Sequence, residues 1–298
     1  MAGQKRPEAA LGRQLLPELP GVGAMIARAA ATSFGRPGAE QGIPQRSVAV
    51  EGYLSDPERL AAYARVCGFT LRDELPATWL HVLTFPLQAW LMSRQDFPFA
   101  LAGILHVSND MTLHRAVTGD EPLTLEVEAR NVRPHRKGVT FDMCGTAHVG
   151  DELVWEGVSV YLAGGKKMPG EPEPGLRLEA PEAATSQRWS LPADLGRQYA
   201  KVSGDVNPIH LHPLGSRIFG LQRPIIHGMW THARAMAALQ GRIGEAHRIQ
   251  VQFTKPLSLP GRANFCVVES DGQARFAVMN SDGSKPYLIG QVDPLQQR

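Results

Sequence analysis

The chain has 298 residues, 43% of them hydrophobic and 20% charged, and a formal net charge of +2. This is the composition of a globular chain with room for two domains of about 120 residues, and the weak charge without a run of Lys and Arg argues against nucleic-acid binding. Three widely spaced cysteines and the lack of a long apolar stretch argue against a disulfide framework, a structural zinc site and a membrane span, so we expect a cytoplasmic protein that acts on small molecules.

Residues 1–45 are rich in Ala, Gly, Pro and Arg and contain one expected helix, at 24–34. Neither a signal peptide nor a transit peptide fits this segment, because Arg28 interrupts its apolar stretch and acidic residues are spread along it. We interpret it as an N-terminal extension that packs on the surface, and the sequence does not indicate its role.

From Ser47 the pattern is that of a domain with both helices and strands. Alternation of apolar with polar or charged residues predicts half-buried strands. The expected elements are a strand at 48–54, a helix at 57–66, an apolar helix at 80–92 and strands at 123–130, 138–149 and 153–162. Four glycines and three prolines at 164–175 then break the pattern, so we place the first domain at 46–165 and a linker at 166–187.

The remaining residues, 188–298, repeat this order. The expected elements are a strand at 189–191, a helix from about 193, a turn, an apolar helix from about 224, and strands at 249–254, 262–270, 273–280 and 286–292. Three segments of the first half can be aligned with the second: 63–69 with 199–205, 84–87 with 226–229, and 113–116 with 253–256. The similarity implies two copies of one unit, and an apolar helix with several alternating strands predicts an α+β unit in which an antiparallel sheet wraps a helix.

The most informative stretch is Tyr199-Ala-Lys-Val-Ser-Gly-Asp-Val-Asn-Pro-Ile-His210. Gly204 is a natural helix end, so Asp205 should lie just past a helix. Asn207 followed by Pro208 is a turn signal, and we expect 205–210 to form a fixed loop that brings the Asp205 carboxylate and the His210 imidazole together. A structural interpretation stays open, in which Asp205 caps the next segment, Asn207 forms an Asx turn and His210 is a half-buried histidine.

This stretch, continued to Ser216, resembles the signature of the MaoC-like (R)-specific enoyl-CoA hydratases and 3-hydroxyacyl-thioester dehydratases. The resemblance covers about 46–298 and implies a double hot-dog fold, with a catalytic domain at 188–298 and a degenerate domain at 46–165 that forms a substrate-binding wall. It implies reversible hydration of trans-2-enoyl thioesters to (3R)-3-hydroxyacyl thioesters. The substrate then carries coenzyme A or acyl carrier protein, no metal or redox cofactor is needed, and two chains could form a homodimer.

The resemblance also implies roles for individual residues. Asp205 and His210 would share one water, with Asp205 the principal proton acceptor and donor and His210 polarising the water. The amide of Gly228 would donate to the thioester oxygen as it becomes enolate-like, because the first amides of a helix lack partners within it. Gly228 could instead serve only close packing. Supporting positions are Tyr199, Ser203, Asn207 and Ser216.

The first half has lost this equipment, since Phe69 aligns with Asp205 and Pro86 with Gly228. One active site per chain follows. The first half is rich in large apolar residues, which either line a slot for an acyl chain or fill the core. They are Phe69, Trp79, Leu83, Phe85, Leu87 and Trp90.

Arg136 and Lys137 lie on a basic tip that would meet the phosphates of coenzyme A or the acidic face of a carrier protein, unless it is only a solvated turn. A metal site is a weaker hypothesis. Asp205, His210, His212, His227 and His232 supply ligand types, but their spacing matches no ordered metal motif.

Two rival functions remain open. A hot-dog thioesterase would direct the Asp205 and His210 water at the carbonyl carbon, although the complete Asp-x-Asn-Pro-x-His motif favours hydration. A non-catalytic acyl-thioester-binding subunit should have lost Asp205 or His210, and this chain retains both.

Overall fold

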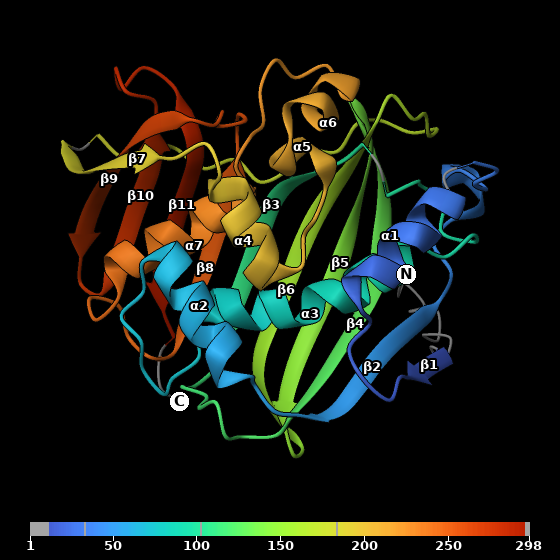
Figure 1. The fold of residues 1–298 in the computed structure, drawn as a ribbon, viewed down its shortest axis with the longest axis horizontal. Coiled ribbons are helices and arrows are strands. Elements are labelled where there is room, and N and C mark those ends of the chain that lie inside the picture. Colours follow the sequence, from blue (N-terminus) through green and yellow to red (C-terminus); the bar gives the residue numbers. More distant parts are fainter. Residues whose placement is uncertain (1–11, 33, 102, 183, 296–298) are drawn as a thin grey trace, which may run out of the picture.

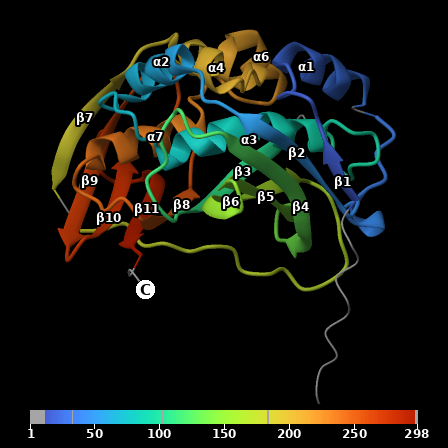
Figure 2. The same cartoon turned by 90° about the horizontal axis from the view of Figure 1, so that it is seen from below.

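A single curved sheet of eleven strands, antiparallel except for the pairing of β1 with β2, dominates the computed structural model, which describes residues 12–32, 34–101, 103–182 and 184–295. The strand order is β1-β2-β4-β5-β6-β3-β8-β11-β10-β9-β7. Apart from β1, this order reads as two equivalent halves that meet where β3 pairs with β8. Figure 2 shows the helices gathered on one face of the sheet, with α3 and α7 directly against it.

The first unit contains β2 (Arg46–Tyr53), α2 (Pro57–Cys67), α3 (Ala77–Met92), β3 (Ile104–Leu113), β4 (Leu123–His135), β5 (Gly138–Val149) and β6 (Glu152–Gly164). The alternation that predicted β4 is visible in its burial, because Leu123, Leu125 and Val127 are fully buried while the residues between them are not. The strand β3 had no counterpart in the expected elements.

The second unit contains β7 (Thr185–Leu191), α4 (Leu195–Ser203), α5 (Pro208–Leu211), α6 (Pro213–Ile218), α7 (Gly228–Leu239), β8 (His247–Phe253), β9 (Gly261–Ser270), β10 (Gln273–Met279) and β11 (Pro286–Pro294). The α+β expectation is confirmed, and each unit has the hot-dog arrangement of one central helix wrapped by a sheet (Figure 1). The second unit has two short helices, α5 and α6, that the first unit lacks.

The pairing of β3 with β8 makes the two units one sheet. Asp110 of β3 lies opposite Gln250 of β8, and the register runs symmetrically to both sides of this pair. The offset of 140 between these two residues is the one found for 113–116 and 253–256 in the sequence, so this part of the internal alignment is confirmed.

Two glycines mark a second equivalence. Gly68 ends α2 and Gly204 ends α4, both in the left-handed conformation, with amides that donate to Ala64 O and Ala200 O. The aligned tyrosines, Tyr63 and Tyr199, are neighbours across the two halves, with ring centroids 6.3 Å apart.

The alignment of 84–87 with 226–229 is wrong. Pro86 lies inside α3, whereas Gly228 is the first residue of α7, so the structural counterpart of Gly228 is Ala77. With the helix starts superimposed, Trp79 corresponds to Trp230 and His81 to His232. The sequence alignment failed because most residues of both helices are apolar, which leaves their register weakly marked.

The N-terminal extension joins the fold more closely than expected. Its strand β1 (Gly12–Leu15) pairs in parallel with β2, and its helix α1 (Val22–Ala31) packs against α3, followed by one 3₁₀ turn at Ala39–Gln41. The expected helix reached to 34, and residue 33 and residues 1–11 lie outside the described residues.

The connection between the two units runs below the sheet, on the face away from the helices (Figure 2). It is fastened there by main-chain groups, because the Glu173 amide donates to Pro134 O and the Leu178 amide to Oε1 of Gln252 on β8. No helix in the described part of the chain is both long and apolar enough to cross a bilayer.

Candidate active site

The end of α4 fixes the position of Asp205. Gly204 takes φ of 78°, a left-handed value that costs glycine little, and this turn directs the next residue away from the helix axis. Oδ1 of Asp205 accepts a hydrogen bond from the Asn207 amide at 3.1 Å, and the Asp205 amide donates to Oγ of Ser203 at 3.2 Å. The carboxylate is therefore held by an Asx turn, in the position past a helix end that the sequence predicted.

His210 does not lie on a loop, as the Asn-Pro pair had suggested, but on the one-turn helix α5. Asn207 is the N-cap of this helix and accepts from the Ile209 amide at 3.3 Å, while Pro208 occupies the first helical position. Both are favourable there, because an Asn side chain satisfies an unpaired amide and proline already has helical φ. Ser216 holds α6 against α5 through its Oγ, which is 3.1 Å from Ile209 O.

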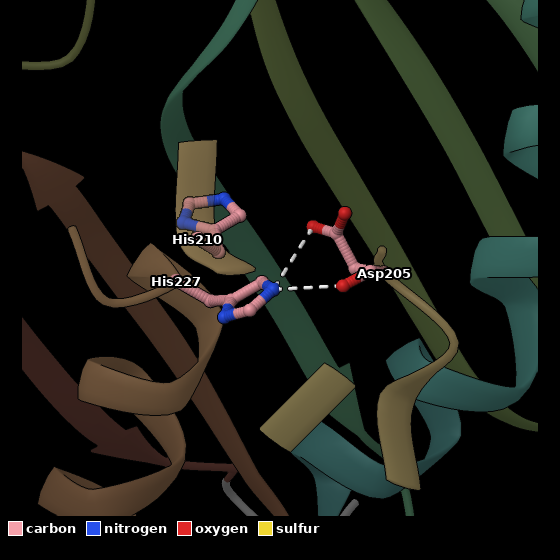
Figure 3. Close-up of side chains that lie close together, drawn as sticks. All are labelled: Asp205, His210 and His227. Carbon is pink, nitrogen blue, oxygen red and sulfur yellow. Dashed lines mark hydrogen bonds and ion pairs between the residues drawn. The ribbon is translucent and has the colours of Figure 1, made fainter. Parts of the chain in front are cut away.

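A third side chain, His227, completes the cluster (Figure 3). Its Nε2 donates to the main-chain oxygen of Asp205 at 2.9 Å and lies 3.9 Å from Oδ2 of the same residue. Its ring stacks on that of His210 with centroids 3.7 Å apart, and the ring of Tyr199 follows at 4.9 Å. One polar side-chain atom each from Asp205, His210 and His227 lies within 4.8 Å of the other two.

Hydrogen bonds and burial determine the protonation of the two histidines. Nδ1 of His210 is 2.8 Å from Ile225 O, and because a carbonyl oxygen only accepts, Nδ1 carries the proton and Nε2 is the acceptor. Burial lowers the pKa of His210, against the opposing effect of the Asp205 charge. Burial, with a smaller contribution from His210, lowers the pKa of His227 to about 3. Both rings are therefore neutral at neutral pH.

Gly228 lies where the packing leaves no space for a side chain. A Cβ there would be 2.9 Å from Cδ1 of Phe253, so close packing does require a glycine at this position. Gly228 is also the first residue of α7, where the helix offers its amide no acceptor, and it lines the same cleft as Asp205 and His210. Its role as a donor to substrate stays a prediction.

Asp205, His210, His227 and Gly228 line one cleft of about 1730 Å³. From Asp205 and Gly228 it extends beneath α3, whose residues His81, Phe85, Ala89 and Met92 line it at intervals of three or four. This spacing places the four side chains on one face of the helix.

Known proteins resemble this chain in both sequence and structure. The model of the MaoC like domain matches residues 172–287. The 3-hydroxyacyl-thioester dehydratase X of Mycobacterium tuberculosis is 35% identical over 253 residues, which are 84% of this chain and 90% of that protein. A crystal structure of HtdX from the same bacterium superimposes with a TM-score of 0.75 at 32% identity, covering 84% of this chain and all of that one.

The chain belongs to the MaoC-like dehydratase family. The resemblance seen in the motif from Tyr199 to Ser216 is thereby confirmed. A MaoC-like dehydratase from Phytophthora capsici, only 16% identical, has a TM-score of 0.69 over 84% of this chain and 95% of its own, which supports the fold alone.

Within this MaoC-like protein, three residues expected in the acyl slot lie elsewhere. Among the described residues, Phe69, Leu87 and Trp90 do not line the cleft. Leu87 is fully buried in the core, and Phe69 and Trp90 pack against it from its edge, so for them the core interpretation is correct. Of the other candidates, Phe85 lines the cleft, on the same side of α3 as Met92.

The two basic residues of the predicted tip, Arg136 and Lys137, border the cleft on the turn between β4 and β5 and are exposed. Residues 172–177 of the linker border it as well. A role of these two cations in substrate binding stays a prediction.

The sequence interpretation missed the polar residues at the start of the slot. His81 on α3 and His106 on β3 line the cleft with rings 5.9 Å apart, and the ring of Tyr161 is 4.7 Å from that of His106. Burial lowers the pKa of His81 to about 4 and that of His106 well below its ordinary value. The signal in the sequence was a histidine inside a helix that has no Asp, Glu, Lys or Arg.

Asp205, His210 and His227 are also the cluster in the described residues that could hold a metal ion. The ring N–H groups of both imidazoles already donate to main-chain oxygens, through Nδ1 of His210 and Nε2 of His227. The remaining acceptors, Nε2 of His210 and Nδ1 of His227, are also suited to a water molecule, which needs two to four polar partners.

Proposed function

We propose that the chain is a hydro-lyase that adds water to trans-2-enoyl thioesters and removes it from (3R)-3-hydroxyacyl thioesters. The observation that carries this proposal is the pairing of a carboxylate with a neutral imidazole acceptor. Asp205 and Nε2 of His210 both accept hydrogen bonds, and atoms of the two side chains lie within 4.8 Å. One water with two hydrogen bonds of about 2.8 Å can bridge such a gap.

The bridged water is aimed for addition. Its two hydrogens point to Asp205 and His210, so an oxygen lone pair is directed away from them toward C3 of the substrate. As the new bond between oxygen and C3 forms, the C2–C3 double bond breaks and its electron pair moves toward the thioester oxygen. The proton of the water passes to the Asp205 and His210 pair, which returns a proton to C2. Water removal is the reverse of these steps.

The growing negative charge on the thioester oxygen needs a donor, and the proposal gives this role to the amide of Gly228. This amide is the first of α7, at the positive end of the helix dipole. A donor fixed before the reaction costs no reorganisation, and removing such a donor typically costs about 3 kcal/mol of barrier.

His227 supports the reaction as a positioning residue. Its hydrogen bond to Asp205 O ties the start of α7 to the Asp205 turn, so that Gly228 and Asp205 keep a constant separation. These residues supply acid, base and oxyanion donor, and the proposed reaction therefore uses no metal or redox cofactor. The thioester carrier would be coenzyme A or an acyl carrier protein in the cytoplasm.

A spectroscopic assay with crotonyl-CoA tests the proposed hydration. The conjugated-enoyl absorbance should fall as water adds, and chiral analysis should find the (3R) product. Release of free thiol at the rate of enoyl loss would instead indicate the rival thioesterase. Binding of enoyl-CoA without turnover of either kind would indicate a binding subunit.

A further inference from the structure

The cleft has a definite direction along α3. His81 marks its inner end, because the charge of Asp205 acts on this histidine. Met92 marks the other end, eleven residues later on the same face of the helix. At a rise of 1.5 Å per residue, the two positions are about 16 Å apart.

The N-terminal extension contributes to the lining of the cleft at the Met92 end of α3. Met25 and Ala29 of α1, one helical turn apart, line the cleft together with Ala89 and Met92 of α3. Met25 is only 6% exposed. Figure 1 shows α1 lying across the end of α3 that is remote from α4 and α7.

Hydrogen bonds of Arg36 hold α1 in this position. The guanidinium of Arg36 donates to the carbonyl oxygens of Met92, at 3.2 Å, and Phe97, at 3.1 Å, and also to that of Arg94. A further bond of 2.7 Å joins it to Oγ1 of Thr32, directly after α1. Carbonyl groups at a helix end lack partners within the helix, so Arg36 satisfies the end of α3 and fixes the extension to it at once.

We propose that α1 is the end wall of the acyl slot and that Met25 and Ala29 set the longest acyl chain accepted. This inference rests on the proposed function and adds the substrate class to it. An extended chain advances about 1.2 Å per bond, so a slot of about 16 Å holds roughly thirteen bonds beyond the reacting carbons. The substrate class is therefore long-chain enoyl thioesters, and crotonyl-CoA reaches none of the wall.

The test is a chain-length profile of kcat/KM with enoyl-CoA substrates from four to about twenty carbons. Ala29→Phe should shorten the longest accepted chain by about two to three carbons, and Met25→Ala should lengthen it by a similar amount. Each CH₂ that loses or gains its apolar contact changes kcat/KM about fourfold, so the longest substrates should change at least tenfold in each variant. Crotonyl-CoA turnover should stay within about twofold.

Arg28→Ala is the matched control, because Arg28 lies on α1 but is exposed and does not line the cleft. It should leave the profile unchanged. Circular dichroism and thermal unfolding check that each variant is folded, and Met25→Ala, a large-to-small change, gives a second reading if Ala29→Phe does not fold. Chain-length profiles that stay unchanged, or that fall equally at all chain lengths, would refute the proposal that α1 is the end wall of the slot. Absence of hydration of any enoyl-CoA by the unaltered protein would instead overturn the proposed function.

Discussion

The two halves of the molecule follow one plan up to the glycine that ends their first helix and then diverge. Gly68 and Gly204 have the same conformation and the same hydrogen bond, but nine positions lead from Gly68 to the start of α3, against twenty-four from Gly204 to the start of α7. The additional residues of the second half form the Asp205 turn, α5 and α6. The two halves therefore differ by a whole segment that carries the catalytic motif. A single substitution in the first half would not supply this segment.

The comparison also shows what both halves keep. Trp79 and His81 of α3 have the same places in their helix as Trp230 and His232 of α7. His81 and His232 are both buried, and burial, with a smaller contribution from His81, lowers the pKa of His232. The two halves thus share the residues that pack α3 against α7, whereas the catalytic motif is present in the second half alone.

The largest expected effect comes from the catalytic pair. Asp205→Asn and His210→Ala should each lower kcat about 10³-fold or more, because a general acid–base group contributes typically 10²–10⁴-fold and the two act on one water. The fold should persist, since the Asx turn and the N-cap do not need the charge. An enoyl-CoA hydration assay measures kcat and circular dichroism checks the fold, and Asp194→Asn, at the N-cap of α4, is the control. Near-normal turnover in either variant would refute the assignment.

Stability should fall with acid because of the buried histidines of both halves. The pKa values of His81, at about 4, and of His227 and His232, at about 3, lie below the ordinary 6.5. Between these values the unfolded chain binds more protons than the folded one, so the free energy of unfolding is highest above pH 6.5 and decreases as pH falls toward 3. Each such group contributes about 1.4 kcal/mol per pH unit.

Denaturant unfolding at several pH values measures this slope. His232→Leu should flatten it by about 1.4 kcal/mol per unit, and should cost little at neutral pH because neither ring nitrogen of His232 has a hydrogen-bond partner in the described structure. Replacement of a histidine of β5 that is only partly buried, His148→Leu, is the control and should leave the slope unchanged. An unaltered slope in His232→Leu would contradict the buried-histidine origin of the acid sensitivity.

A smaller effect should separate the two roles of Gly228, whose counterpart Ala77 carries a Cβ. Gly228→Ala should destabilise by about 1–3 kcal/mol, because the new Cβ would be 2.9 Å from Phe253. Adding Phe253→Leu should make room for it, and since alanine keeps the amide hydrogen, both stability and kcat should recover together. A normal kcat in Gly228→Ala, despite the loss of stability, would show that the glycine serves packing alone.

The smallest effect is expected when a carboxylate is introduced in the first half, at the position aligned with Asp205. Phe69→Asp should create no second site, because the first half lacks the segment that supplies His210. A titration with a stable thioether analogue of the product should still find one site per chain, and kcat should stay within about twofold. Two sites per chain would refute the division between the halves.

The sequence was sufficient for the repeated unit, for most strands and for Asp205 past the end of α4, because alternation and a glycine helix stop are local signals. It did not predict α5, since Asn-Pro serves equally as a turn and as an N-cap followed by the first helical residue. For Phe69, Leu87 and Trp90 the sequence left both the slot and the core open, because the size of a side chain does not show its direction. Which side of an apolar helix faces a cavity depends on the elements packed around it, and α1 in particular has no pattern that places it against Met92.

The pairing of β3 with β8 has a thermodynamic consequence. In a dimer of separate subunits, the population of complete sites depends on protein concentration, whereas here one covalent linker keeps both halves at a constant effective concentration. The cleft that joins His81 of one half to Asp205 of the other is therefore assembled intramolecularly. Specific activity per chain should not fall on dilution, even at concentrations where a two-subunit relative would dissociate and lose its site.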